Sequence, residues 1–139
     1  MQLRWQRTVL LTACITMASA AHAGSPDVTF TVVNNGFGAW TIDGNDNPPL
    51  TLLRGKTYAF ALQGVGAVHP FNINTIDTIG AANQYNVGVT NNGATGNAVL
   101  TFEVPVSAPD TLHYNCANHA AMNGPITIIN DELFANGFD

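Results

Sequence analysis

A short segment near the carboxyl end of the chain carries three metal-ligating side chains at even spacing. Cys116, His119 and Met122 form the pattern C-x-x-H-x-x-M. A thiolate, an imidazole and a thioether are soft or borderline ligands, which suit copper better than magnesium or calcium. These ligand types occur together in trigonal His₂Cys copper sites with a weak axial methionine, so a second histidine is required. His69, in the segment 66–71, is the obvious donor.

The amino-terminal residues are typical of a secretory signal. Arg4 and Arg7 precede an apolar stretch at 8–20, and an Ala-His-Ala cleavage site follows at 21–23. The apolar stretch is too short to span a bilayer, and no later stretch is long enough either, so we expect no stable membrane insertion. The sequence therefore predicts export to the periplasm or the cell exterior.

The sequence divides the chain into three predicted parts. Residues 1–23 are predicted to be a cleaved signal peptide, residues 24–130 a single domain, and residues 131–139 an acidic carboxyl-terminal tail. The middle part is modest in size but long enough to bury one hydrophobic core. We see no repeat and no second domain.

Removal of the signal makes the protein strongly acidic. Only Arg54 and Lys56 remain as basic residues, against nine acidic ones, which gives a formal charge of −7. Such a surface argues against binding to nucleic acid or to anionic membranes. It favours a basic protein partner, although the same charge also serves solubility alone.

The cysteine count gives a second indication of metal binding. Cys14 leaves with the signal, so Cys116 is the one cysteine of the mature chain. In an oxidising compartment a lone cysteine has no internal disulfide partner, and metal ligation would protect it. A buried inert thiol is the alternative, but it does not explain why His119 and Met122 follow at equal steps.

Short strand-like runs separated by Gly, Asn and Pro predict an all-β sandwich or barrel. No window shows sustained helical periodicity. Residues 74–97 are expected to form long surface loops around a weak strand near residues 85–89. The clearer predicted strands are 28–33, 39–42, 50–52, 57–62, 98–104, 112–116 and 124–129.

Side chains alternate along the predicted strand 112–116. Leu112, Tyr114 and Cys116 therefore share one face, and His113 and Asn115 share the other. If the first face is the core face, the cysteine lies at the inner end of the strand, where water is scarce. His113 is then expected to be a surface histidine rather than a ligand.

An apolar rim is expected around the second histidine of the site. Phe71, Ala120, Ala121 and Pro125 lie close in sequence to the predicted ligands and would surround a partly exposed His119. Such a rim is a plausible docking patch, although small apolar residues are common on protein surfaces.

Three segments resemble the cupredoxins, the plastocyanin and azurin class of blue copper proteins. Residues 50–60 resemble the family's strand-turn-strand before the first ligand, and residues 109–116 resemble its ligand strand. The short C-x-x-H-x-x-M loop is most similar to that of amicyanin. The resemblance implies a Greek-key β-sandwich with one type 1 copper ion. It also implies four ligands: His69, Cys116, His119 and Met122.

The sequence departs from the family pattern at two positions beside the ligands. Plastocyanin and azurin have Asn after the first histidine, with an N–H that reaches the cysteine sulfur, whereas this chain has Pro70, which has no N–H. Plastocyanin and amicyanin have Pro just before the second histidine, whereas this chain has Asn118, which does have an N–H. We therefore expect the sulfur to exchange one donor for the other.

The sequence favours an exported one-electron carrier that cycles between Cu(II) and Cu(I) and exchanges electrons with unidentified redox proteins. We expect it to be a monomer and not an enzyme, because multicopper enzymes need more histidines and binuclear copper sites need two cysteines. A copper-handling protein with the same ligands is the alternative, although the chain lacks additional Met/His clusters. A zinc Cys-His₂ site also remains open, but zinc gains little from Met122.

Overall fold

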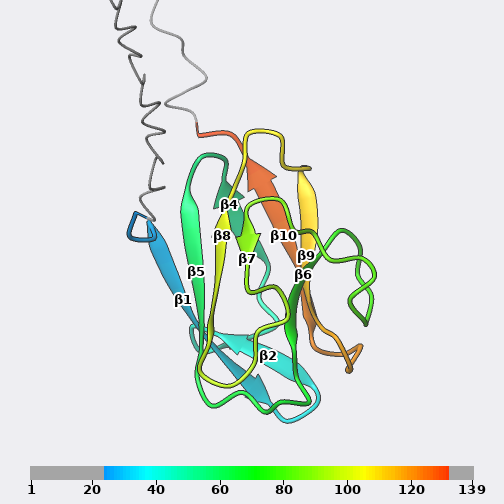
Figure 1. Cartoon of the computed structure of the whole chain (residues 1–139). Coiled ribbons are helices and arrows are strands. Elements are labelled where there is room, and N and C mark those ends of the chain that lie inside the picture. Colours follow the sequence, from blue (N-terminus) through cyan, green and yellow to red (C-terminus); the bar gives the residue numbers. More distant parts are fainter. Residues whose placement is uncertain (1–23, 132–139) are drawn as a thin grey trace, which may run out of the picture.

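The computed structural model describes residues 24–131, which form ten β-strands and no helix (Figure 1). The strands are β1 (Val28–Asn35), β2 (Ala39–Ile42), β3 (Asn45–Asp46), β4 (Leu50–Leu53), β5 (Thr57–Leu62), β6 (Phe71–Asn74), β7 (Val89–Thr90), β8 (Val99–Glu103), β9 (Thr111–Cys116) and β10 (Asn123–Ile129). One sheet has the order β3-β2-β1-β5-β8-β7, and the other has the order β4-β10-β9-β6.

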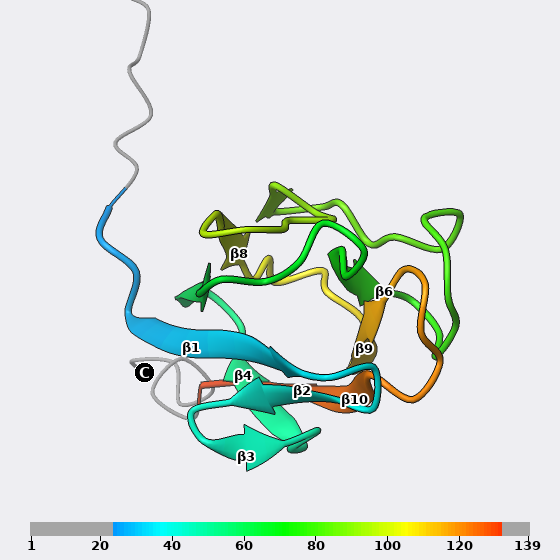
Figure 2. The ribbon, with the colours of Figure 1, turned by 90° about the horizontal axis from the view of Figure 1, so that it is seen from below.

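Both sheets are mixed. β1 pairs in parallel with β5, and β4 pairs in parallel with β10, whereas the other neighbours are antiparallel. Strands that are adjacent in a sheet are often distant in the chain, so the connections cross between the two layers (Figure 2). The predicted all-β Greek-key sandwich is thereby confirmed.

All seven of the more clearly predicted strands are present, and their observed ends differ from the predicted ends by two residues at most. In β4, β8 and β10 buried side chains alternate with more exposed ones, as the sequence pattern predicts. In β10 the even-numbered residues from Gly124 to Ile128 are buried, and the odd-numbered residues from Pro125 to Ile129 are exposed. One face of β10 therefore packs into the core while the other meets water.

Strand β6 was not predicted, although it lies beside the ligand strand β9. All four of its residues are buried, including two asparagines. The side chain of Asn72 donates to the carbonyl of Gly80 at 3.0 Å, and that of Asn74 donates to the carbonyl of Thr78 at 2.9 Å. These hydrogen bonds offset part of the cost of burying the two amides; among the described residues the Oδ1 atom of Asn74 has no hydrogen-bond partner.

The segment 75–97 forms surface loops around one short strand, as predicted, and hydrogen bonds tie it to β6. The amide of Asn92 accepts the Ile73 N–H at 2.8 Å and donates to the carbonyls of Ile73 at 3.1 Å and Tyr85 at 2.9 Å. It thus satisfies the backbone at the free edge of β6, where an unpaired strand edge would be exposed. The predicted weak strand near residues 85–89 is found slightly later, as β7.

Asn115 shows that the second face of β9 is covered as well. Leu112, Tyr114 and Cys116 are buried as predicted, but Asn115 on the other face is also buried, at 1% exposed. Its side chain donates to the Asp77 carboxylate at 2.7 Å. The segment after β6 therefore covers this face of β9, a contact that strand alternation alone does not predict.

The hydrophobic core joins the two sheets. Its largest fully buried side chains are Trp40, Tyr114, Phe60, Phe71, Phe102, Ile42, Leu52, Ile73, Leu100, Leu112, Met122 and Ile126. Phe71 is therefore a core residue and not part of an exposed rim around the site. Burial raises the pKa of the Tyr114 phenol well above its usual value, so the group stays neutral.

The predicted signal peptide at 1–23, and all but the first residue of the predicted acidic tail at 131–139, lie outside the described residues. Within the described range 24–131, no helix is long and apolar enough to cross a membrane.

Candidate metal centre

Three connections at the same end of the sandwich build the site. They are the turn between β1 and β2, the segment 63–70 before β6, and the loop 117–122 between β9 and β10 (Figures 1 and 2). The strands bring these connections together from positions far apart in the chain. Strand register therefore decides which of their side chains meet.

Cys116 is the last residue of β9 and is fully buried. Its N–H donates to the carbonyl of Met122 at 2.8 Å, which closes the loop 117–122 upon itself. The Met122 N–H in turn donates to the carbonyl of His119 at 3.1 Å. These two hydrogen bonds turn the chain tightly enough to bring His119 back over the cysteine.

His69 reaches the cysteine through strand pairing. β6 lies antiparallel to β9 with Phe71 opposite Cys116, so the residues just before Phe71 lie beside the ligand loop. The His69 N–H donates to the carbonyl of Gly66 at 2.9 Å, and the Ala117 N–H donates to that of Pro70 at 3.0 Å. The first of these bonds lies within the segment 63–70, and the second joins this segment to the ligand loop directly beside the site.

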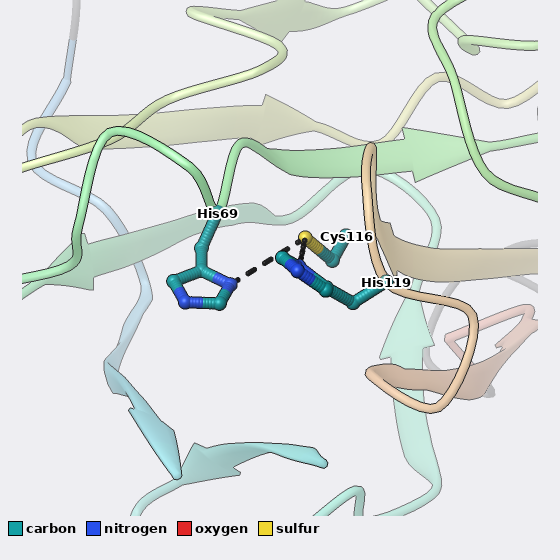
Figure 3. Close-up of side chains that lie close together, drawn as sticks. All are labelled: His69, Cys116 and His119. Carbon is teal, nitrogen blue, oxygen red and sulfur yellow. Dashed lines mark hydrogen bonds between the residues drawn. The ribbon is translucent and has the colours of Figure 1, made fainter. Parts of the chain in front are cut away.

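The side chains of His69, Cys116 and His119 form one group of metal-donor atoms (Figure 3). The Nδ1 atoms of His119 and His69 lie 3.4 and 3.8 Å from the Cys116 sulfur, and the three donor atoms lie within 4.8 Å of one another. Metal bonds of about 2.3 Å to sulfur and about 2.0–2.1 Å to nitrogen, meeting at roughly 105–120°, would separate the two donors by about 3.4–3.8 Å. The arrangement thus fits a single first-row metal ion.

The two histidines differ in their exposure to water. His69 is buried at 4% exposed, whereas His119 is half-buried. Burial lowers the pKa of the His69 imidazole from its usual value, and the charge of the nearby His119 acts in the same direction. His69 is therefore held in the neutral form, which is the form that ligates a metal.

Solved structures with a similar fold are known. Rusticyanin from Thiobacillus ferrooxidans matches with a TM-score of 0.51 at 20% identity, over 76% of this chain and 79% of that one. Reduced rusticyanin matches with a TM-score of 0.52 at 20% identity, over 76% and 82%. Auracyanin B, at 16% identity over 76% and 91%, has a TM-score of 0.48. The chain has the cupredoxin fold.

No family model matches the chain, and no curated protein matches it. At the low sequence identities above, the comparison with solved structures supports the cupredoxin fold itself. What this chain binds has to be argued from its own side chains. The group of one thiol and two imidazoles at one end of the sandwich is the feature that bears on that question.

The expected exchange of hydrogen-bond donors at the sulfur is confirmed. The N–H of Asn118 donates to the Cys116 sulfur at 3.5 Å. The same residue also has a structural role, because its side chain donates to the carbonyl of Val68 at 2.9 Å. Asn118 therefore fastens the loop 117–122 to the segment that carries His69, a contact that the sequence did not predict.

Met122 is fully buried at the end of the loop 117–122. In the chain it follows the three residues of the metal-donor group. Its backbone forms hydrogen bonds with the backbones of both Cys116 and His119. His113, by contrast, lies outside the group of donors and is half-buried in β9. Met122 as a fourth, axial ligand stays a prediction.

Sequence reasoning missed one aromatic residue at the site. Phe37, in the turn between β1 and β2, has its ring centroid 5.0 Å from that of His119 and 5.3 Å from that of His69. The residue is 66% exposed. The segment Asn34-Asn35-Gly36 before it is typical of a turn, but nothing local indicates that this turn reaches the two histidines.

Proposed function

We propose that the protein is an exported one-electron carrier that holds a single type 1 copper ion. The observation that carries the proposal is the buried Cys116 sulfur with two imidazole Nδ1 atoms at 3.4 and 3.8 Å. A thiolate with two imidazoles suits copper, which when bound supplies the Cu(II)/Cu(I) couple. One of the similar solved structures is described as that of the copper protein rusticyanin, which supports the same metal.

His69, Cys116 and His119 are the proposed trigonal ligands, and Met122 is the proposed weak axial ligand. The thioether suits this role because it is soft and because burial keeps water away from it. Zinc would use the same thiolate and imidazoles but would gain little from the thioether. The full set of four therefore favours copper.

Backbone hydrogen bonds hold the ligands in place. The backbone N–H of His69 donates to the carbonyl of Gly66, and that of Cys116 donates to the carbonyl of Met122. Ala117, between the ligands, donates to Pro70 and accepts from the Gly80 N–H at 2.8 Å. A site held by the fold in this way rearranges little when the metal gains or loses an electron, which favours a carrier over a protein that releases its metal.

The remaining features fit an exported carrier rather than an enzyme. The predicted signal peptide directs the chain to the periplasm or the exterior, where one buried cysteine is best protected as a ligand. The formal charge of −7 after residue 23 favours basic redox partners. We expect the protein to act as a monomer. Three histidines and one cysteine after residue 23 are too few for the multinuclear copper sites of oxidases.

The test is the visible and EPR spectrum of the mature protein during titration with Cu(II). We expect one ion per chain, an intense thiolate-to-copper band and narrow copper hyperfine splitting. The band should bleach on reduction and return on reoxidation over many cycles. A colourless complex, or an ordinary tetragonal copper spectrum, would overturn the type 1 assignment.

Copper handling is the second candidate, because the same ligands could deliver or sequester the ion. A competing Cu(I) chelator separates the two functions. A carrier should keep its metal through repeated redox cycles and show fast electron self-exchange. A handling protein should lose Cu(I) to the chelator within the first cycles.

Asn118 offers a test of the second coordination shell. We expect Asn118→Pro to have a lower copper reduction potential than Asn118→Ala, because only the proline variant loses the N–H to the sulfur. That N–H stabilises negative charge on the thiolate, and the reduced site is the more negative one. A difference of about 60 mV corresponds to about 1.4 kcal/mol for one electron, the scale of a weak hydrogen bond to a charged group.

The two variants share the loss of the side-chain bond to Val68, so each serves as the control for the other. Protein-film voltammetry at constant pH gives both potentials directly. Equal potentials for the two variants would show that the N–H does not act on the sulfur.

A further inference from the structure

Phe37 is placed unusually for an exposed phenylalanine. Single exposed apolar residues are common and need no explanation. This one contacts both histidines of the metal centre, with its ring tilted by 42–43° to theirs. The two histidine rings are themselves 4.6 Å apart. The three rings form one cluster, and Phe37 is its most exposed member.

The turn that carries Phe37 is fixed by hydrogen bonds on both sides. The Gly38 N–H donates to the carbonyl of Asn35 at 3.2 Å, and the side chain of Asn35 donates to the Asp46 carboxylate at 2.8 Å. Gly36 has φ of +56°, a conformation that glycine adopts without strain. The position of the phenyl ring is therefore set by the hairpin and not by the histidines alone.

The same hairpin places a second aromatic ring on the inner side of the site. Trp40, in β2, is fully buried and lies edge-on to His69, with centroids 6.4 Å apart. His69 thus has a buried indole on one side and the exposed phenyl of Phe37 on another. Between these rings, the Nδ1 atom of the imidazole lies 3.8 Å from the Cys116 sulfur.

We propose that Phe37 is a cover over the donor group: its ring closes the water-facing side of the His69–His119 pair and restricts small reagents from reaching the Cys116 sulfur. In the copper protein the same cover slows exchange of the metal with solvent. The copper part rests on the function proposed above, whereas protection of the thiol in the metal-free protein does not.

The first measurement uses the metal-free protein. The rate at which Cys116 reacts with an aromatic disulfide reagent should rise in Phe37→Ala by about tenfold, the equivalent of a barrier lowered by about 1.4 kcal/mol. Phe37→Leu keeps apolar bulk over the histidines and should react at close to the wild-type rate. A wild-type rate in Phe37→Ala would overturn the proposal.

Val68→Ala is the matched control. Val68 is also exposed, at 56%, and it is the neighbour of His69, but its side chain belongs to no ring cluster. This variant should leave the rate of thiol modification unchanged. An equal acceleration in Val68→Ala would show a general loosening of this end of the sandwich and would contradict the specific role of Phe37.

Global unfolding is separated from local access by the denaturant dependence of the rate. Reaction through a local opening depends weakly on low urea concentrations, whereas reaction through the unfolded state increases with the full unfolding m-value. If the faster reaction of Phe37→Ala showed the full m-value, the variant would be globally destabilised and the cover would be refuted.

The second measurement is the rate of copper loss to a chelator from loaded Phe37→Ala and wild-type protein. Faster loss from the variant is expected. If the thiol is shielded in the metal-free protein but no type 1 spectrum forms, the cover stands and the proposed function fails. If the spectrum forms but neither rate changes in the variant, the function stands and the cover fails.

Discussion

Cys116→Ser should abolish the intense visible band and the narrow copper hyperfine splitting of the copper-loaded protein. Both signals require a thiolate bound to Cu(II), and Cys116 is the single cysteine of the described residues. A serine hydroxyl does not ionise near neutral pH and is a poor copper ligand. We expect copper affinity to fall by at least about 100-fold, since loss of an outer-shell partner alone costs 10–100-fold.

His113→Ala is the matched control for this prediction. His113 is on the same strand, three residues before the cysteine, but lies outside the group of donor atoms. Its removal should leave the spectrum and the stoichiometry unchanged. A blue complex in Cys116→Ser, or its loss in His113→Ala, would show that the thiol is not the ligand or that the ligand set is wrongly assigned.

Gly124→Ala should destabilise the fold strongly, although it adds one methyl group. A Cβ at this position would lie 2.7 Å from Tyr114 Cε1 and closer still to the ring carbon Cζ and the hydroxyl oxygen. Tyr114 is fully buried, and its hydroxyl donates to the carbonyl of Pro48 at 2.7 Å, so its ring has little freedom to move. We expect the free energy of unfolding to fall by about 3 kcal/mol, at the upper end of overpacking effects.

Denaturant unfolding of the metal-free protein measures this change. Gly38→Ala is the control, because the nearest atom to its added Cβ is the carbonyl oxygen of Asn35 at 3.9 Å, an ordinary contact. In the double variant Gly124→Ala, Tyr114→Leu, removal of the ring should recover part of the loss as a coupling energy. Additive effects of the two substitutions would place the strain elsewhere.

The sequence by itself determined most of the strands. It also determined three groups of the site, namely the Cys116 thiol, the His119 imidazole and the Asn118 N–H. Strands such as β5 and β10 were predictable because their apolar residues alternate over six or seven positions and turn residues follow. Cys116 and His119 were predictable because their spacing is encoded within one loop. The donation of an N–H by Asn118 to the sulfur was also predictable, since it follows from a proline at one position and its absence at another.

Only the tertiary structure decided which distant segments meet. Strand β6 was not predicted, because its two asparagines are buried and donate to the carbonyls of Gly80 and Thr78, an arrangement that no strand pattern indicates. Its register, with Phe71 opposite Cys116, fixes the position of His69 beside the sulfur. Register of this kind depends on side-chain packing between strands about forty residues apart, which no local pattern contains.

Phe37 shows the same limit at the surface of the site. Its turn was recognisable from Asn and Gly, but its contacts with His69 and His119 arise because three connections meet at one end of the sandwich. Local sequence specifies turns and alternation, since these depend on near neighbours. The enclosure of the donor group depends on how both sheets pack, and so it was decided by the tertiary structure alone.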